Sequence, residues 1–168
     1  MSIQKNNQEL NKPVGGVRIG HINLKVADLN RALAFYSGVL GFKITKQIGD
    51  EAVFLAYGGY HHDICLNTWH SKNGSVPAQG TTGLFHLAIL FSKRSEMIKV
   101  YQRLKAADVI ITSVVDHVVN ESIYLNDPDG NGIELYWDRP EEHWWDQNGN
   151  LKMEYHSVDP EAFLKECV

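Results

Sequence analysis

The chain has 168 residues, of which 43% are hydrophobic and 21% charged, so its composition is that of an ordinary globular protein. Its formal net charge is −4 and no basic patch stands out, which argues against a nucleic-acid partner. The apolar runs are strand-sized, well short of the roughly 20 residues that cross a bilayer, so we expect no membrane partner. The polar N-terminus lacks the apolar core of a secretory signal. The 2 cysteines do not indicate a disulfide framework, and a reducing cytoplasm is the expected compartment.

The first block of predicted elements has the order β-α-β-β-β. Residues 1–16 are expected to form a flexible arm, and VRIGHINLKV at 17–26 alternates apolar residues as a strand does. A helix is predicted over 28–42, because apolar residues recur on one helical face and Asp28 is a typical N-cap. Three strand-sized segments separated by turn residues follow, at 42–50, 51–59 and 61–69.

A second block repeats this order after a linker at 70–82, which is rich in Gly, Ser, Pro and Asn. A strand is predicted over 83–91 and a helix over 93–108, with Ser92 or Ser95 as its cap. Three more strands are predicted over 109–118, 121–127 and 130–138. Residues 139–168 break the pattern, and we expect a turn and a short helix that covers a sheet edge or contacts a partner chain.

The two blocks form an internal repeat of structural pattern rather than of identical sequence. His21 of GHINLKV corresponds to His86 of FHLAILF, and Trp69 of LNTW corresponds to Trp137 of ELYW. The chain also has 8 histidines, which is a first indication of metal or proton chemistry.

The stretches GHINLKVADLNRALAFYSGVLGF and YLNDPDGNGIELYW, in paired β-α-β-β-β modules, resemble the vicinal oxygen chelate superfamily. This is the glyoxalase, bleomycin-resistance and extradiol-dioxygenase group. The resemblance implies an α+β fold, in which two paired βαβββ modules form a cup-shaped, partly open mixed-sheet barrel around a metal site. It makes 17–138 a single domain, with module 1 at 17–69, the linker at 70–82 and module 2 at 83–138. Residues 139–168 are then a C-terminal extension.

Three side chains are candidates for holding the metal that this fold implies. His21 and His86 lie in the first strands of the two modules, and Glu134 lies in the last strand of the second. Apolar and aromatic residues flank Glu134, and a carboxylate is costly to bury in such a strand without a partner. Two imidazoles and one carboxylate make the facial triad of non-haem Fe(II) sites, which leaves positions open for substrate and dioxygen.

The equivalent position in the first module separates enzyme classes within the superfamily. Glyoxalase I-type enzymes generally supply a ligand from the last strand of each module. The alignment rests on the two tryptophans, Trp69 and Trp137. Leu66 then corresponds to Glu134 and cannot bind a metal, and neither of its neighbours, Cys65 and Asn67, is a usual ligand there. We therefore predict a three-ligand site, which argues against a glyoxalase I.

Three further residues resemble catalytic groups of extradiol dioxygenases, which cleave catechols next to the diol. The strand HHDICLNTW is similar to one in which the histidine just before the aspartate is the acid–base group, and His62 holds that position. The adjacent His61 is expected to be a turn residue. The segment VVDHVVNESIYLNDPDG is similar to one whose histidine and tyrosine bind the catecholate, and these correspond to His117 and Tyr124.

The resemblance therefore implies a ring-cleaving enzyme like the catalytic half of a catechol 2,3-dioxygenase, acting on a small aromatic diol and O2. Fe(II) is the expected cofactor, with Mn(II) or another divalent metal as alternatives. Well-known extradiol enzymes have two pairs of modules, whereas this chain resembles the catalytic pair alone. The linker, the C-terminal extension or a second subunit would have to complete the enclosure, and a homodimer or higher homo-oligomer is expected.

Two other functions stay open on the sequence. One is a glyoxalase-family metal-dependent lyase, or a thiol or epoxide transferase of the resistance type, on the same three ligands. A phosphonate substrate would need a cationic pocket, and lysine and arginine are sparse near the predicted site. The other is a drug- or metabolite-binding module, which would leave the three candidate ligands unexplained. Trp144 and Trp145 fit either a pocket entrance or a dimer contact.

Overall fold

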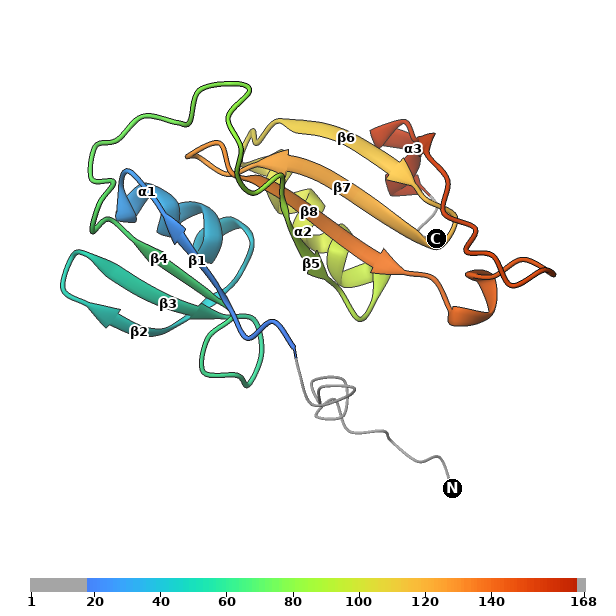
Figure 1. Cartoon of the computed structure of the whole chain (residues 1–168), viewed down its shortest axis with the longest axis horizontal. Coiled ribbons are helices and arrows are strands. Elements are labelled where there is room, and N and C mark those ends of the chain that lie inside the picture. Colours follow the sequence, from blue (N-terminus) through green and yellow to red (C-terminus); the bar gives the residue numbers. More distant parts are fainter. Residues whose placement is uncertain (1–17, 166–168) are drawn as a thin grey trace.

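The fold consists of two mixed β-sheets with helices packed on one face (Figure 1). The computed structural model of the chain describes residues 18–165, so the predicted arm at 1–16 lies outside the described residues. The sheets do not close into a barrel, and the α+β class and the partly open cup are both confirmed. In the described part of the chain, no helix is long and apolar enough to cross a membrane.

The first sheet has the strand order β1-β4-β3-β2. β1 and β4 pair in parallel, and the other neighbours pair antiparallel. The elements of this module are β1 (Ile22–Lys25), α1 (Leu29–Leu33), the π-helix η2 (Ala34–Val39), β2 (Lys43–Ile48), β3 (Ala52–Ala56) and β4 (Ile64–Asn67).

The second sheet repeats this topology in the order β5-β8-β7-β6 and adds β9 at its edge. Its elements are β5 (Leu87–Leu90), α2 (Arg94–Ala106), β6 (Ile111–Asp116), β7 (Asn120–Asn126) and β8 (Gly132–Asp138). The predicted β-α-β-β-β order is therefore confirmed in both modules. The C-terminal extension contains η3 (Glu141–His143), β9 (His156–Ser157) and α3 (Pro160–Lys165). β9 pairs with β6, so the extension covers a sheet edge as expected.

The two helical segments differ in how they begin. Asp28 is the N-cap of α1, as predicted, since its side chain accepts a hydrogen bond from the backbone N–H of Arg31. For α2 the predicted cap is wrong, because Lys93 takes the N-cap position without a side-chain hydrogen bond. Glu96 in the first turn of α2 places a negative charge at the helix N-terminus, where the backbone dipole favours it.

Alternation along the strands decides which residues face the helices and which face the open side of each sheet. Ile64 and Leu66 of β4, like Ile133 and Leu135 of β8, belong to the buried hydrophobic core beneath the helices. Because successive strand residues point to opposite faces, Glu134 lies on the open face of the second sheet. The predicted site residues therefore belong to the side of the sheets that the helices do not cover.

Candidate metal centre

The second module brings a carboxylate and an imidazole together on its open face. The Nε2 atom of His86 lies 3.0 Å from Oε2 of Glu134, whose residue is only 9% exposed. The other carboxylate oxygen, Oε1, accepts hydrogen bonds from the hydroxyls of Ser122 (2.6 Å) and Tyr124 (2.8 Å). The β7–β8 register causes this arrangement, since it places Tyr124 directly opposite Glu134. One oxygen of the carboxylate is thus fixed by hydroxyls, and the other points to the histidine.

This pair fits one side of a divalent-metal site. Two adjacent ligands held about 2.1 Å from one ion at a right angle would be roughly 3 Å apart, and the separation of Nε2 and Oε2 is 3.0 Å. The Nδ1 atom of His86 is buried without a hydrogen-bond partner. Nε2, the ring nitrogen that faces the carboxylate, is the atom placed to bind the ion, whereas Nδ1 is on the other side of the ring.

A second cluster lies in the first module, around His62. The ring of His21 is 4.5 Å from that of His62, and Phe54 meets the His62 ring edge-on at 5.0 Å. His62 lines an open hollow of about 430 Å³ together with Thr45, Lys46, Phe54 and His61. Partial burial, then the neighbouring histidines His21 and His61, hold the pKa of His62 below its usual value, which favours the neutral imidazole.

His61 is closer to this cluster than the sequence indicated. It was expected to be only a turn residue, yet its Nδ1 atom lies 2.6 Å from Nδ1 of His62. Its ring also stacks on Tyr60, with ring centroids 4.0 Å apart. The two adjacent histidines just before β4 could have indicated this cluster. However, successive strand residues point to opposite faces, so alternation predicts that only one of them lies on the site face. The turn before β4 lets both contribute.

His117 and Tyr124, the two residues predicted to bind the catecholate, lie next to each other beside the Glu134 carboxylate. The Nε2 atom of His117 is 3.0 Å from the Tyr124 hydroxyl, which is also hydrogen-bonded to Glu134. Burial, together with the adjacent Glu134 carboxylate, raises the pKa of Tyr124 to about 12, so the phenol keeps its proton. On the far side of the histidine ring, Nδ1 is 2.7 Å from the backbone carbonyl of Glu154. No pattern in the sequence indicated that contact from the C-terminal extension.

The three predicted metal ligands are not gathered in one place. His21 contacts His62 in the first module, whereas His86 contacts Glu134 in the second. Among residues 18–165, no group of three or more His, Cys, Asp or Glu side chains is arranged to hold a metal ion. β1 and β5 run in opposite directions (Figure 1), and each histidine directly precedes its strand. The chain therefore presents two separate half-sites.

The strand register also corrects the residue that corresponds to Glu134 in the first module. Ile22, which follows His21, pairs with Ile64, so the next pair along β1 and β4 is Asn23 with Cys65. In the second module the same step from His86 leads to Glu134, which pairs with Ala88. Cys65, not Leu66, therefore occupies the equivalent position. Alignment on the tryptophans gave Leu66 because it shifted β4 by one residue.

Cys65 is a buried thiol whose pKa is raised by that burial. A thiol that keeps its proton is a poor metal ligand, because metals bind the thiolate. The first module therefore offers no carboxylate at this position, as expected. The argument for three ligands is therefore unchanged, although the residue equivalent to Glu134 is Cys65 and not Leu66.

The comparisons with known proteins agree with this architecture. Residues 18–135 match the family model of the Glyoxalase/Bleomycin resistance protein/Dioxygenase superfamily. The chain belongs to this superfamily. Two solved structures of the superfamily fold are a glyoxylase/bleomycin resistance protein/dioxygenase domain from Frankia sp. EAN1pec and a lactoylglutathione lyase from Agrobacterium tumefaciens. Their TM-scores are 0.61 and 0.56 at 22% and 23% identity. They cover 73% and 75% of this chain, and 98% and 96% of their own.

The sequence is similar to those of several characterised proteins whose activities differ. Catechol-2,3-dioxygenase of Bacillus subtilis (strain 168) is 39% identical over 151 residues, which are 89% of this chain and 52% of that protein. Biphenyl-2,3-diol 1,2-dioxygenase 3 of Rhodococcus globerulus is 31% identical, over 74% of this chain and 67% of its own length. Metallothiol transferase FosB of Lysinibacillus sphaericus (strain C3-41) is 29% identical, over 70% and 80%. The chain thus spans about half the length of the Bacillus relative.

Proposed function

We propose that the protein is an extradiol-type dioxygenase, which cleaves the ring of a catechol-like diol with O2 and uses Fe(II) held by His21, His86 and Glu134. The observation that carries the proposal is the His86–Glu134 pair with the Tyr124–His117 pair directly behind it. The two dioxygenase relatives support the same activity. Mn(II) or another divalent metal is the alternative cofactor.

Each residue of the proposed site has a role that follows from its chemistry. When bound, the metal would chelate the two diol oxygens and favour their deprotonated form. His62 accepts a proton from the diol, for which a neutral imidazole is suited. Tyr124 keeps its proton and donates a hydrogen bond, and His117 places its Nε2 atom beside that hydroxyl. These two residues orient the diol on the side of the second module.

The proposed ligand set is completed between two copies of the chain. His21 of one copy would lie against His86 and Glu134 of the other, and a second, identical site would form by symmetry. This follows from the two half-sites that a single chain separates. The open faces also carry exposed apolar side chains that a second copy would cover, including Ile48 and Leu90. The domain is then 17–138, with its two modules contributing to different sites.

Ring cleavage is tested by anaerobic loading with Fe(II), followed by addition of catechol or a substituted catechol and O2. A yellow ring-opened product is expected. Glu134→Ala should lose both the metal and the colour, and His62→Ala should keep the metal and lose the colour. Asp138→Asn is the matched control, since it removes a carboxylate farther along the same strand and should keep both. If wild-type protein holds Fe(II) stoichiometrically but produces no colour from any catechol, the proposed activity is wrong.

The shared site is tested by mixing two variants that each lack one half of the ligand set. His21→Ala and Glu134→Ala are given different affinity tags, co-expressed, and the mixed dimer is isolated through both tags. The mixed dimer should bind one Fe(II), because one of its two sites retains every ligand. The single-variant dimers should bind none. A mixed dimer without metal would show that each site is built within one chain.

A metal-dependent thiol transferase is the second candidate, and the FosB relative is the observation that favours it. Lys46 lines the hollow beside His62 and would be the cation for an anionic substrate. Arg139 is already engaged by Asp116 and Glu121. Incubation of the Mn(II)-loaded protein with a phosphonate epoxide and a thiol separates the two functions. Thiol addition without any cleavage of catechols would favour the transferase.

A further inference from the structure

The C-terminal extension is a fixed part of the second module. Val115 and Asp116 of β6 pair with β9, and the backbone N–H of Val158 donates to the carbonyl of Val114 (2.9 Å). Farther along, Phe163 is buried and packs edge-on against Tyr101 of α2. Figure 1 shows this segment along the outer edge of β6, with α3 behind it. The residues just before β9 are therefore held in place beside the proposed site.

Glu154 forms two backbone hydrogen bonds with His117. Its N–H donates to the His117 carbonyl (3.1 Å), and its carbonyl lies 2.7 Å from Nδ1 of the His117 ring. A carbonyl can only accept, so Nδ1 must carry the proton. In the neutral ring, Nε2 is then the bare nitrogen and can only accept, so it competes with Oε1 of Glu134 (2.8 Å) for the single proton of the Tyr124 hydroxyl, 3.0 Å away. The extension thus determines which nitrogen of His117 is presented to the site.

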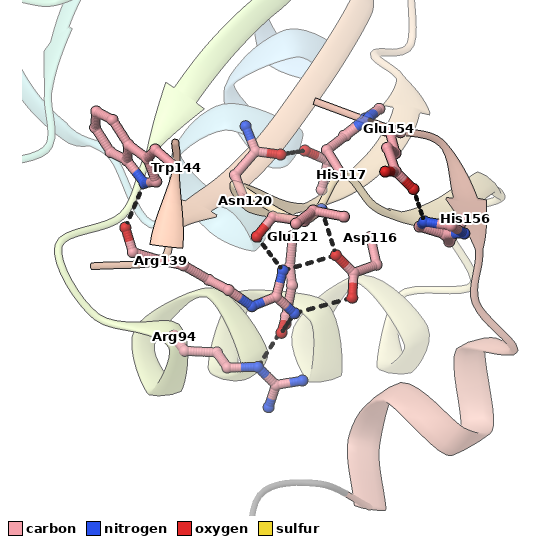
Figure 2. A network of polar contacts seen from close by, with 11 residues as sticks. Arg94, Asp116, His117, Asn120, Glu121, Arg139, Trp144, Glu154 and His156 are labelled. Atoms are coloured by element: carbon pink, nitrogen blue, oxygen red, sulfur yellow. Dashed lines mark hydrogen bonds and ion pairs between the residues drawn. The ribbon is translucent and has the colours of Figure 1, made fainter. Parts of the chain in front are cut away.

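The turn that carries His117 is strained and is held from the opposite side as well. Val118 has a φ of 70°, in the left-handed region that β-branched residues avoid. Its N–H donates to Asp116 (2.7 Å), and Arg139 donates both to Asp116 and to the Val118 carbonyl. Figure 2 shows this charged network beneath the turn, with Glu154 beside His117. Strain of this kind persists only where the surroundings enforce it, and it is concentrated at functional sites.

Tyr155 places an aromatic ring next to the same histidine. Its ring meets that of His117 at 72° with centroids 5.9 Å apart, and its residue is 66% exposed. The His117 ring in turn meets the Tyr124 ring at 89° with centroids 6.3 Å apart, so the three rings lie in sequence along this side of the site. An exposed aromatic ring leaves apolar surface in contact with water, which is unfavourable, and it offers a rigid apolar surface to a ligand. Its position beside the two diol-contacting residues makes it a natural wall for an aromatic substrate.

We propose that Glu154 and Tyr155 form one wall of the substrate site, in which the Glu154 carbonyl positions His117 and the Tyr155 ring limits the substituents that fit on the diol. Glu154 acts through His117 and is a positioning residue. Tyr155 is a specificity-determining residue. The substrate class rests on the proposed function, whereas the positioning of His117 does not.

The specificity half is tested with Tyr155→Ala and Tyr155→Phe in the full-length Fe(II) enzyme. The measured quantity is the ratio of kcat/KM for biphenyl-2,3-diol to that for catechol. Tyr155→Ala should raise the ratio by about 10-fold, the scale on which a hydrophobic wall discriminates, and Tyr155→Phe should leave it unchanged. Trp145→Ala, another exposed aromatic of the extension, is the matched control and should also leave it unchanged. If wild type turns over both diols and Tyr155→Ala has the wild-type ratio, the specificity role is wrong.

The positioning half is tested without any substrate, by ¹⁵N NMR of the histidine side chains in the full-length protein. The His117 signals are identified by their loss in His117→Gln. At a pH where the ring is neutral, His117 should be in the Nδ1–H form, whereas exposed His70 should show a mixture led by Nε2–H. An Nε2–H form of His117 would overturn the role of Glu154. This result stands whether or not the protein cleaves catechols.

Two substitutions of His117 then separate function from packing. His117→Asn retains a donor for the Glu154 carbonyl but cannot reach Tyr124, and His117→Gln reaches toward Tyr124 but cannot serve Glu154. If the wall only stabilises the fold, His117→Asn should keep the higher kcat. If the carbonyl presents Nε2 to the site, His117→Gln should keep the higher kcat although it is the less stable variant.

Discussion

At the scale of single residues, Val118 is the clearest case of backbone strain. Its φ of 70° is a conformation that costs a β-branched residue about 1 kcal/mol or more. Val118→Asn should therefore raise the free energy of unfolding by about 1 kcal/mol, because asparagine tolerates this region. Urea unfolding monitored by circular dichroism measures the change. A variant less stable than wild type would show that the partly buried valine side chain contributes more than its strain costs.

Ser122 is the residue whose loss should reveal how the carboxylate is prepared for a metal. Its hydroxyl donates to Oε1 of Glu134 from a fully buried position. Removing such an outer hydrogen bond from a metal ligand typically lowers affinity about 10- to 100-fold. We expect Ser122→Ala to weaken Co(II) binding by that factor, as measured by competition with a chelator. Ser113→Ala in β6 is the control, and an equal effect of both substitutions would contradict the role of Ser122.

At the scale of elements, a charge network links the β6–β7 hairpin to α2. Arg139 pairs with Asp116 and Glu121, and Glu121 also pairs with Arg94 of α2 at 2.5 Å. Burial pushes the pKa of Asp116 upward, but hydrogen bonds from Arg139 and from the N–H of Val118 outweigh it and leave the pKa lowered. Because its pKa is lower in the folded state, Asp116 stabilises the fold at pH values above 3.8, the ordinary pKa of the group. This contribution is lost as the pH falls through the folded-state pKa.

Asp116→Asn should therefore destabilise the protein by about 1 kcal/mol near neutral pH. The difference from wild type should shrink as the pH falls below 3.8, because the wild-type carboxylate is then being protonated too. Urea unfolding of both proteins across this range measures it. A difference that does not change with pH would mean that the network does not depend on the charge of Asp116.

The elements themselves could largely be predicted from the sequence, because hydrophobic period and turn residues are local properties. Asp28 marked the start of α1 and the two modules had the expected strand order. The residue opposite Glu134 could not be predicted, since periodicity reports the face of a strand and not its partner. Pairing placed Cys65 there. β9 was missed for a similar reason, as its two residues carry no pattern and form a strand only through β6.

At the scale of the whole molecule, the DPDG stretch joins the two modules. Asp127 accepts the hydroxyl of Tyr36 at 2.8 Å, and Asp129 accepts Arg31 at 2.6 Å and the N–H of Ala27 at 2.9 Å. The turn of the second module thus holds the first helix of the first module. The candidate site residues stay predictions from the sequence, and their division into half-sites could not be predicted from it. No local pattern records how these contacts orient one module against the other.

Tyr36 is the contact on which this orientation should depend most. It is fully buried, and burial together with Asp127 raises its pKa, so it remains a donor to the carboxylate. Tyr36→Phe leaves a buried carboxylate short of one hydrogen bond, which should cost about 1.5–3 kcal/mol. The control is Tyr101→Phe, at a residue that is as buried overall but whose hydroxyl makes a part-buried contact with the neutral carbonyl of Pro160 at 3.4 Å. Its cost should be smaller.

The same substitution links the fold to the proposed shared site. If the modules of one chain contribute to different metal sites, their relative placement fixes the distance between the half-sites of a dimer. Tyr36→Phe should then weaken Fe(II) binding as well as stability, although Tyr36 lies on the helix side of the sheets, away from Glu134. Tyr101→Phe should leave Fe(II) binding unchanged. If Tyr36→Phe is destabilised but binds Fe(II) as tightly as wild type, the metal site does not depend on this contact between modules.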